Sequence, residues 1–278
     1  MMNTKELRTI ITNRLKTAGN AEAAAISAVL LMRGLNLTKT ELIIGDYVPT
    51  NEQIKLLDEW VKRAEKDEPV QYIVGETEFM SLKFKVCKGV LIPRADTEIL
   101  VSEVLGRVKD KKSPVIWDLC CGSGCIGISL AYYKKDLSAR LADISRTALN
   151  VSDDNINEYN LSDRVKTVCF DVLTDEMPCA ADCVVSNPPY IAHDVIGSLD
   201  KNVRCFEPSL ALDGGADGLN FYRKIAANAK IKDGGILAFE IGFDQKDEVE
   251  EILEQNRYQN IKTVNDIENR PRVVIGTR

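Results

Sequence analysis

Apolar residues at the start of the chain recur every three or four positions, which is typical of amphipathic helices. Leu7, Ile11 and Leu15 follow this spacing. The alanine-rich stretch after Asn20 continues it, and so does the segment that begins at Asn51. We therefore expect a small helical bundle over residues 1–70.

Between residues 71 and 93 the apolar period changes from three or four positions to two, which is typical of strands. Gly75, Gly89 and Pro93 bound the short runs in this region. The pattern predicts a β-hairpin and one further short strand. We expect this region to join the helical bundle to the rest of the chain.

From residue 94 to residue 278, short apolar runs alternate with amphipathic segments of helical length. Strands joined by helices at such spacing predict a parallel sheet covered on both faces. The fold class is therefore α/β, with a doubly wound, mostly parallel sheet and a small helical domain in front of it. The predicted strands are PVIWDL, SARLADI, VKTVCF, ADCVVS, GILAFEIG and two more at the end; the predicted helices are CIGISLAYYKK, RTALNVSDDNINEYN, residues 219–230 and DQKDEVEEILEQN.

The charge balance and histidine content narrow the possible functions. The 278 residues include 36 basic and 42 acidic side chains, for a net charge of −6. Affinity for nucleic acid rests largely on Lys and Arg that neutralise phosphates, so we expect no direct nucleic-acid binding. His193 is the single histidine. Sites built from several histidines are therefore excluded, and no metal site is predicted.

The apolar runs and cysteines indicate the compartment. No run approaches the roughly 20 apolar residues that span a bilayer. The first residues are charged and amphipathic, without the apolar core of a secretory signal. We expect a soluble, cytoplasmic protein that makes no membrane contact. The eight cysteines form no CxxC pair, and Cys169 and Cys183 lie within apolar runs. Reduced and mostly buried thiols are therefore expected, rather than disulfides or zinc ligands.

A glycine-containing turn follows the first strand of the predicted sheet. Asp118 is followed by Leu-Cys-Cys-Gly-Ser-Gly up to Gly124, and a helix begins there. Asp143 closes the second strand and Asp171 the third, where acids contact the ribose and base of a nucleotide in this fold class. The third glycine of the dinucleotide fingerprint is displaced into the helix. Carboxylates around such a turn suit S-adenosylmethionine better than NAD, because S-adenosylmethionine has no pyrophosphate.

The tetrapeptide Asn187-Pro188-Pro189-Tyr190 follows the fourth predicted strand. Two prolines fix the backbone and remove two N–H donors, which leaves a stiff loop with free carbonyl oxygens. Such a loop can accept both N–H bonds of a planar NH₂ group, and Tyr190 can stack on its plane. A rigid turn without a ligand is the alternative. Its place at the carboxyl end of a strand favours a binding role.

These motifs resemble those of S-adenosylmethionine-dependent methyltransferases that act on exocyclic or amide nitrogens. Three longer stretches resemble the release-factor glutamine methyltransferases, the HemK/PrmC family, which have a class I, Rossmann-like fold. They are residues 69–101, which contain PRADTE, residues 203–225 after the NPPY motif, and residues 234–245 around the fifth strand. The resemblance covers the whole chain. Cys120 and Cys121 occupy the first two positions of a loop that usually reads G-x-G-x-G, and Pro271 stands where an aspartate is common.

The resemblance implies methyl transfer from S-adenosyl-L-methionine, with S-adenosyl-L-homocysteine as product. The acceptor would be the amide nitrogen (N5) of the glutamine in the Gly-Gly-Gln loop of class 1 peptide-chain release factors, and the N-terminal bundle would dock that partner. Asn187 Oδ1 and the Pro188 carbonyl would accept the two N–H bonds, Tyr190 would pack on the amide, and Pro189 would complete the substrate site. The cofactor residues implied are Asp118, Cys120, Cys121, Gly122, Ser123, Gly124, Asp143, Asp171, Val172 and Asn187.

Residues near the NPPY motif receive lesser roles. His193 is expected to be a bystander, and Arg204 and Glu207 to brace the long loop or to contact the substrate protein.

Three other functions compete with this interpretation. DNA adenine N6-methyltransferases share NPPY, but the net charge of −6 and the lack of a basic insert disfavour DNA as substrate. An NAD-dependent dehydrogenase is disfavoured by the displaced third glycine. A cofactor-binding partner protein without turnover would have no need of an intact NPPY motif.

Overall fold

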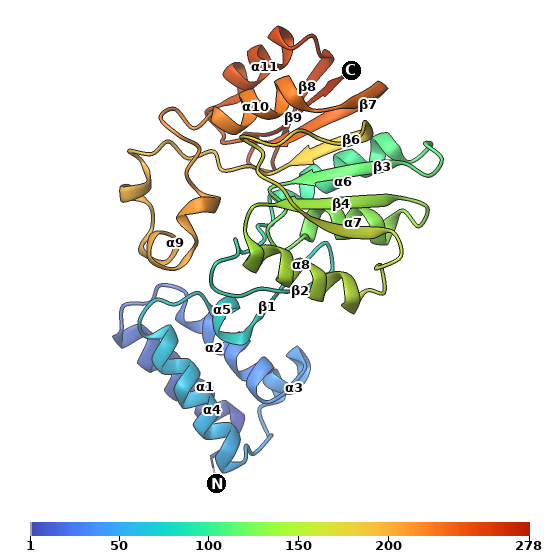
Figure 1. Cartoon of the computed structure of the whole chain (residues 1–278). Coiled ribbons are helices and arrows are strands. Elements are labelled where there is room, and N and C mark those ends of the chain that lie inside the picture. Colours follow the sequence, from blue (N-terminus) through green and yellow to red (C-terminus); the bar gives the residue numbers. More distant parts are fainter. Residues whose placement is uncertain (1) are drawn as a thin grey trace. The chain divides into compact units, whose positions relative to one another are not determined.

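The computed structural model describes residues 2–278 and divides into two compact units. The first unit comprises the described residues up to Glu76 together with Asp200–Phe206. The second comprises Thr77–Leu199 and Glu207–Arg278. Figure 1 gives the course of the chain through both, and the labels used below are those of that figure.

The first unit is helical. Leu7, Ile11 and Leu15 are buried in its core, as their spacing predicts. Asn3, Thr38 and Thr50 are N-caps whose side chains accept a backbone N–H and complete capping boxes, which explains where three of the helices begin. The helices are α1 (Thr4–Thr17), α2 (Ala23–Gly34), α3 (Lys39–Ile44), α4 (Asn51–Ala64), α5 (Val70–Val74) and the later α9 (Lys201–Phe206).

The region from residue 70 to residue 93 differs in part from its prediction. Strands β1 (Glu76–Phe79) and β2 (Leu82–Lys85) form the predicted hairpin. Residues 71–74, expected to be extended, belong instead to α5, because Pro69 starts a helical turn and Gly75 ends it with a left-handed φ of 82°. The further short strand does not form: residues 86–93 have no strand pairing.

The second unit is built on a seven-stranded sheet with the order β5-β4-β3-β6-β7-β9-β8. All neighbours from β5 to β7 are parallel, and β9 pairs antiparallel with both β7 and β8. The predicted mostly parallel α/β fold is confirmed. The strands are β3 (Val115–Leu119), β4 (Ser138–Asp143), β5 (Val165–Cys169), β6 (Ala181–Ser186), β7 (Ile231–Glu240), β8 (Gln259–Asn265) and β9 (Pro271–Thr277).

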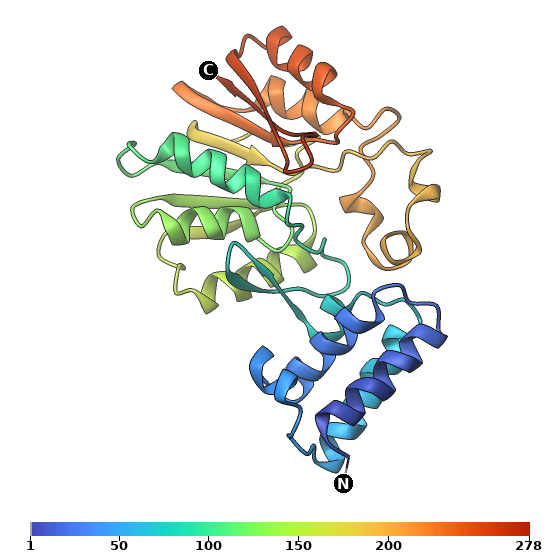
Figure 2. The same cartoon turned by 180° about the vertical axis from the view of Figure 1, so that it is seen from behind.

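Helices cover both faces of this sheet, as seen in Figure 1 and from behind in Figure 2. Helices α6 (Thr97–Val108), α7 (Cys125–Tyr133) and α8 (Arg146–Glu158) contribute to one apolar core with the sheet. Helices α10 (Asn220–Asn228) and α11 (Lys246–Gln255) contribute to the other. Helix α6 is absent from the prediction. The strand order reverses between β4-β3 and β3-β6, which places a crevice beyond the carboxyl ends of these strands.

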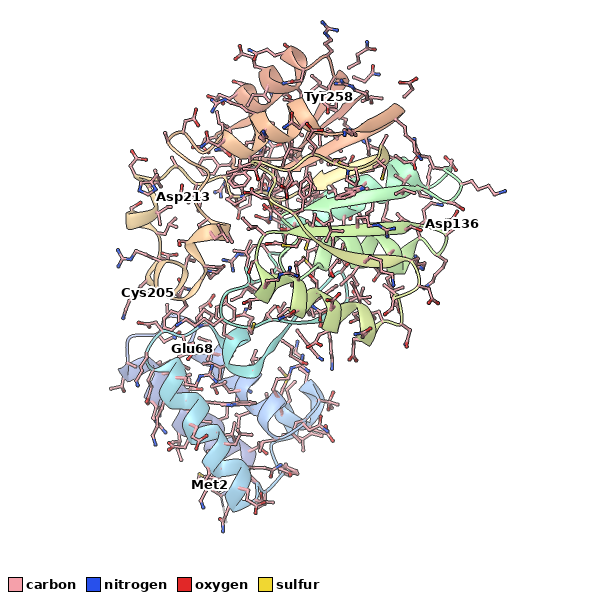
Figure 3. All side chains as sticks on the ribbon, viewed as in Figure 1. Met2, Glu68, Asp136, Cys205, Asp213 and Tyr258 are labelled. Carbon is pink, nitrogen blue, oxygen red and sulfur yellow. The ribbon has the colours of Figure 1, made fainter. Side chains whose placement is uncertain are left out.

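The cysteine prediction is only partly correct. All eight thiols are free. Cys121, Cys125 and Cys183 are buried, but Cys169, Cys179 and Cys205 are exposed. Cys169 lies in an apolar run, yet β5 is the edge strand of the sheet and its last residue faces solvent. Cys205, labelled in Figure 3, lies on α9.

None of the helices among residues 2–278 combines the length and the apolar character that a membrane crossing requires.

Candidate active site

A cavity opens at the carboxyl ends of β3, β4 and β6, where the strand order predicts a ligand site. The turn after β3 forms one wall, and the segments that follow β4, β5 and β6 form others. The segment before α6 and the loop before α10 complete it. Its lining includes Gly89, Val90, Pro93, Arg94, Thr97, Cys120, Cys121, Gly122, Ser123, Cys125, Asp143, Ile144, Asp171, Val172, Leu173, Asn187, Pro189, Pro208, Leu210 and Phe221.

The turn between β3 and α7 contains three residues with left-handed backbone. Cys120, Gly122 and Gly124 have φ angles of 59°, 56° and 77°. At Gly124 a Cβ would lie 2.9 Å from the Leu141 and Ser152 side chains, so glycine is needed there for space as well as for conformation. The Ser152 hydroxyl donates to the Gly122 carbonyl at 3.0 Å. The turn is therefore held by α8 in one shape.

Cys120 is a non-glycine residue in the left-handed region, which costs roughly 1–2 kcal/mol. Cys120 is the first residue of this loop, a position that is glycine in the usual G-x-G-x-G pattern. We expect Cys120→Gly to raise the free energy of unfolding by about 1 kcal/mol, because the relieved strain exceeds the entropy that glycine loses on folding. Cys120→Ala keeps a Cβ and should give no such gain. Urea denaturation of both variants measures the difference, and equal stabilities would contradict a strained Cys120.

Asp118 lies beneath this turn rather than in the cavity wall. It is fully buried, and its Oδ2 accepts the Gly127 N–H at 2.9 Å. Its Oδ1 has no hydrogen-bond partner in the described part of the chain. Burial raises the pKa of Asp118 to about 7, against the opposing effect of the Gly127 hydrogen bond. Asp118 therefore supports the turn through α7, and the cofactor contact expected of it stays a prediction.

The raised pKa of Asp118 makes stability depend on pH. Between pH 3.8 and about pH 7 the folded protein binds a proton at Asp118 that the unfolded chain has released, so stability falls as pH rises through this window. Asp118→Asn replaces the titrating carboxyl by an amide that does not titrate, and its side-chain oxygen can still accept the Gly127 N–H. Relative to the parent, the variant should gain on the order of 2–4 kcal/mol between pH 4 and pH 8. Denaturation at both pH values checks this, and a constant difference would contradict it.

Asp143 and Asp171 reach the cavity as predicted. Asp143 accepts the Gly122 N–H through Oδ2 at 2.9 Å and the Ser145 N–H through Oδ1 at 2.8 Å. Each carboxylate oxygen keeps a further lone pair for a ligand hydroxyl. Burial raises the pKa of Asp143. Asp171 accepts the Leu173 N–H through Oδ1 at 2.9 Å, which shapes the turn after β5.

Two apolar residues at the cavity, Ile144 and Leu173, were missed by sequence reasoning. They follow the strand-end acids Asp143 and Asp171 closely, and they are 47% and 42% exposed. A sequence signal for them was available. A polar turn residue is the ordinary choice next to a strand-end acid, and a large apolar side chain at that place indicates a ligand contact. Together with Val172 they offer apolar faces to a flat ring.

The NPPY motif follows β6 directly and is braced from behind. Ile191 and the segment 212–214 exchange backbone hydrogen bonds, with Ile191 N donating to Leu212 O at 2.9 Å. A Cβ on Gly218 would lie 2.4 Å from the Tyr190 carbonyl, so glycine permits this close approach. The Gln245 side chain donates to the same carbonyl at 2.9 Å. The loop is therefore fixed by neighbours as well as by its two prolines.

The members of the motif face different ways. Asn187 and Pro189 line the cavity, whereas Pro188 and Tyr190 are not among the described lining residues. Tyr190 packs against the apolar core beneath α10 and α11, and burial raises its pKa to about 12. The Asn187 amide nitrogen donates to Thr97 Oγ1 at 3.4 Å. The Asn187 carboxamide is thus the polar group that NPPY brings to the cavity.

Two ion pairs lie close to this site. Arg94 at the cavity donates to Glu207 at 2.5 Å, and the Glu207 side chain is 2% exposed. Glu207 therefore connects the loop before α10 to the segment before α6. This contact is the kind of loop bracing expected of Glu207 from the sequence. His193 Nδ1 lies 2.7 Å from Asp213, which is labelled in Figure 3, and this carboxylate raises the pKa of the exposed His193.

The structure brings together most of the predicted site residues. In the cavity wall lie Cys120, Cys121, Gly122, Ser123, Asp143, Asp171, Val172, Asn187 and Pro189. The described lining does not include Asp118, Gly124, Pro188 or Tyr190. Of these, Asp118 and Gly124 support the turn, and Tyr190 packs in the core behind the loop.

Known proteins share both parts of this architecture. Residues 95–201 match the family model of the methyltransferase small domain, and residues 6–75 match that of the PrmC N-terminal domain. A solved methyltransferase from Pyrococcus furiosus superposes with a TM-score of 0.51 over 72% of this chain and 90% of that one. At 14% identity this likeness shows the fold alone.

Curated relatives extend over nearly the whole chain. The release factor glutamine methyltransferase of Clostridium botulinum is 41% identical over 256 residues, which cover 90% of each chain. That of Clostridium acetobutylicum is 42% identical over 257 residues, which cover 91% of this chain and 90% of the relative. With identity at this level over both the helical and the sheet regions, the chain belongs to the release factor glutamine methyltransferase family.

Proposed function

We propose that the protein transfers a methyl group from S-adenosyl-L-methionine to the side-chain amide nitrogen (N5) of a glutamine. The acceptor is the glutamine of the Gly-Gly-Gln loop in class 1 peptide-chain release factors, and S-adenosyl-L-homocysteine is the second product. The observation that carries this proposal is the Asn187 carboxamide. It stands on a rigid loop at the wall of a cavity that also contains the strand-end acids. Family membership supports the same activity.

The cavity suits the proposed cofactor. Asp143, whose oxygens each hold one backbone N–H, can accept the two ribose hydroxyls. Ile144, Val172 and Leu173 offer apolar contact to the adenine, and Asp171 can accept from its amine. Cys120 and Cys121 lie in the turn where the methionine part would pass. When bound, S-adenosylmethionine supplies an electrophilic methyl group on its sulfonium.

The NPPY loop accounts for activation of the acceptor. An amide nitrogen is a weak nucleophile because its lone pair is delocalised into the carbonyl. Asn187 Oδ1 accepts one N–H of the substrate amide and the Pro188 carbonyl accepts the other, which stabilises positive charge as it develops on nitrogen. Tyr190 supports the loop from the core side, and its raised pKa of about 12 keeps the phenol un-ionised. Positioning contributes several kcal/mol to such a transfer. The proton leaves to solvent afterwards, so no strong base is needed.

The partner is a protein rather than a nucleic acid. The net charge of −6 disfavours a phosphate surface, and we assign the docking of the release factor to the N-terminal helical bundle, residues 1–70. We further propose that the reaction takes place in the cytoplasm.

Mass spectrometry tests the proposal directly. Purified protein, S-adenosylmethionine and a release factor should yield a Gly-Gly-Gln peptide heavier by one methyl group, with the modification on the glutamine side chain. A release factor in which that glutamine is alanine is the matched control. Duplex DNA in place of the release factor should remain unmodified. A methylated adenine together with an unmodified peptide would overturn the proposal.

A further inference from the structure

A buried carboxyl group lies behind the Asn187 side chain. In the parallel pairing of β6 and β7, Ser186 is opposite Phe239, so the next residues along the two strands, Asn187 and Glu240, are neighbours. Glu240 is 1% exposed, and its Oε2 has no hydrogen-bond partner within residues 2–278. An unpartnered buried carboxyl oxygen is costly to a fold, and such groups cluster where function requires them.

Thr97 links this carboxyl group to the Asn187 amide. It is the first residue of α6, is 2% exposed, and accepts the Asn187 N–H at 3.4 Å. Burial raises the pKa of Glu240 to about 7, and the neighbouring Thr97 and Asn187 side chains oppose this rise by favouring the charged form. Arg272 on β9 also favours the charged form, and Asp96 before α6 opposes it. The Thr97 hydroxyl, which accepts from Asn187, therefore keeps its own proton to direct toward Glu240.

The orientation of the Asn187 carboxamide decides whether it can serve the proposed reaction. Its oxygen and nitrogen ends have nearly the same shape, so packing alone does not distinguish the two. Oδ1 toward the substrate accepts an N–H of the glutamine amide. Nδ2 toward the substrate would set one NH₂ group against another. The charged form of Glu240, which prevails above pH 7, accepts only, so it selects the orientation with Nδ2 turned inward.

We propose that Glu240 and Thr97 are positioning residues that hold Nδ2 of Asn187 inward and thereby present Oδ1 to the substrate amide. This inference rests on the proposed function for its catalytic consequence, but the orientation itself is a property of the free protein. Neither residue touches the acceptor amide in this scheme; both act through Asn187. The feature that carries it is the buried, partly unpartnered carboxyl group placed beside Asn187 by the strand register.

Thr97→Val tests the link, because valine keeps the shape of threonine and removes the hydroxyl. We expect kcat for release-factor methylation to fall about 10- to 100-fold, with KM for the release factor changed less than about three-fold. Thr97→Ser restores the hydroxyl and should recover most of the turnover. Ser129→Ala, which removes another fully buried hydroxyl of the same unit, should leave turnover unchanged. Glu240→Gln, which keeps one acceptor oxygen, should lower kcat about 10-fold. It replaces Thr97→Val as the test variant if Thr97→Val does not fold.

A second measurement does not depend on activity. In protein with isotope-labelled asparagine, the NH₂ resonances of Asn187 are those missing from Asn187→Asp. They should shift in Thr97→Val and keep their positions in Thr97→Ser and Ser129→Ala. Unshifted resonances in Thr97→Val overturn the inference, and so does a kcat loss in Ser129→Ala equal to that in Thr97→Val. If the resonances shift as expected but the parent protein methylates no release factor, the proposed function fails and the orientation stands.

Discussion

Asn187→Ala should reduce the rate of release-factor methylation by about two to three orders of magnitude, the loss typical when one charge-stabilising hydrogen-bond group is removed from an active site. The side chain lies in the cavity wall on a loop held by two prolines and by Gln245, so its loss leaves the backbone in place. The substrate amide then loses an acceptor, and its lone pair is no longer directed. Binding of S-adenosylmethionine should change by less than about three-fold, because Asp143 and the turn after β3 are untouched.

Single-turnover kinetics measures the rate loss and titration calorimetry the cofactor affinity. Asn187→Asp is the second variant to measure. It keeps an acceptor oxygen but loses the NH₂ group that donates to Thr97 Oγ1. It should be slower than the parent and faster than Asn187→Ala. Full turnover in Asn187→Ala would remove the amide-acceptor role from the NPPY loop.

Asp143→Ala should produce the reverse pattern, with the dissociation constant of S-adenosylmethionine raised about 100-fold, or roughly 3 kcal/mol. Two effects combine. The ribose hydroxyls lose a carboxylate acceptor, and the Gly122 N–H that Asp143 holds at 2.9 Å is released, so the turn loses a constraint. At saturating cofactor, turnover should approach that of the parent, because the NPPY loop is intact.

Calorimetry with S-adenosylmethionine and with S-adenosylhomocysteine checks this, and Asp143→Asn separates the two effects. Asparagine keeps one acceptor oxygen and loses the charge, so we expect a smaller loss of about 10-fold. Unchanged affinity in Asp143→Ala would mean that the ribose is bound elsewhere. An affinity loss in Asn187→Ala equal to that in Asp143→Ala would contradict the separation of the two roles.

The sequence predicts well what depends on local periodicity and on the ends of strands. The sheet strands, the acids Asp143 and Asp171, and the NPPY loop all follow from apolar runs and from the polar residues that end them. Helix α6 is absent from the prediction although Leu100, Val101, Val104 and Val108 recur at helical spacing, so the signal was present in the sequence. The prediction that Cys169 is buried is wrong, because an edge strand cannot be recognised before the strand order is known.

Within the site, the residues that act from behind could not be predicted. Asp118 ends up beneath the turn because the hydrogen bond to Gly127 depends on how α7 packs on β3. Thr97 and Glu240 are 143 positions apart, and only the placement of α6 on the sheet and the register of β6 with β7 bring both to Asn187. Such contacts are tertiary, so no spacing along the chain reports them.

The assignment of Asp200–Phe206 to the helical unit has a practical consequence for dissection of the protein. The polypeptide passes between the two units three times, at residues 76, 199 and 206. Lys201 on α9 pairs with Asp67 at 2.6 Å, so a fragment that ends at residue 76 lacks a piece of its own unit. A fragment that starts at residue 77 carries that piece without its partners. Separate expression of the bundle would therefore need α9 supplied in trans or grafted through a short linker, as in a circular permutant.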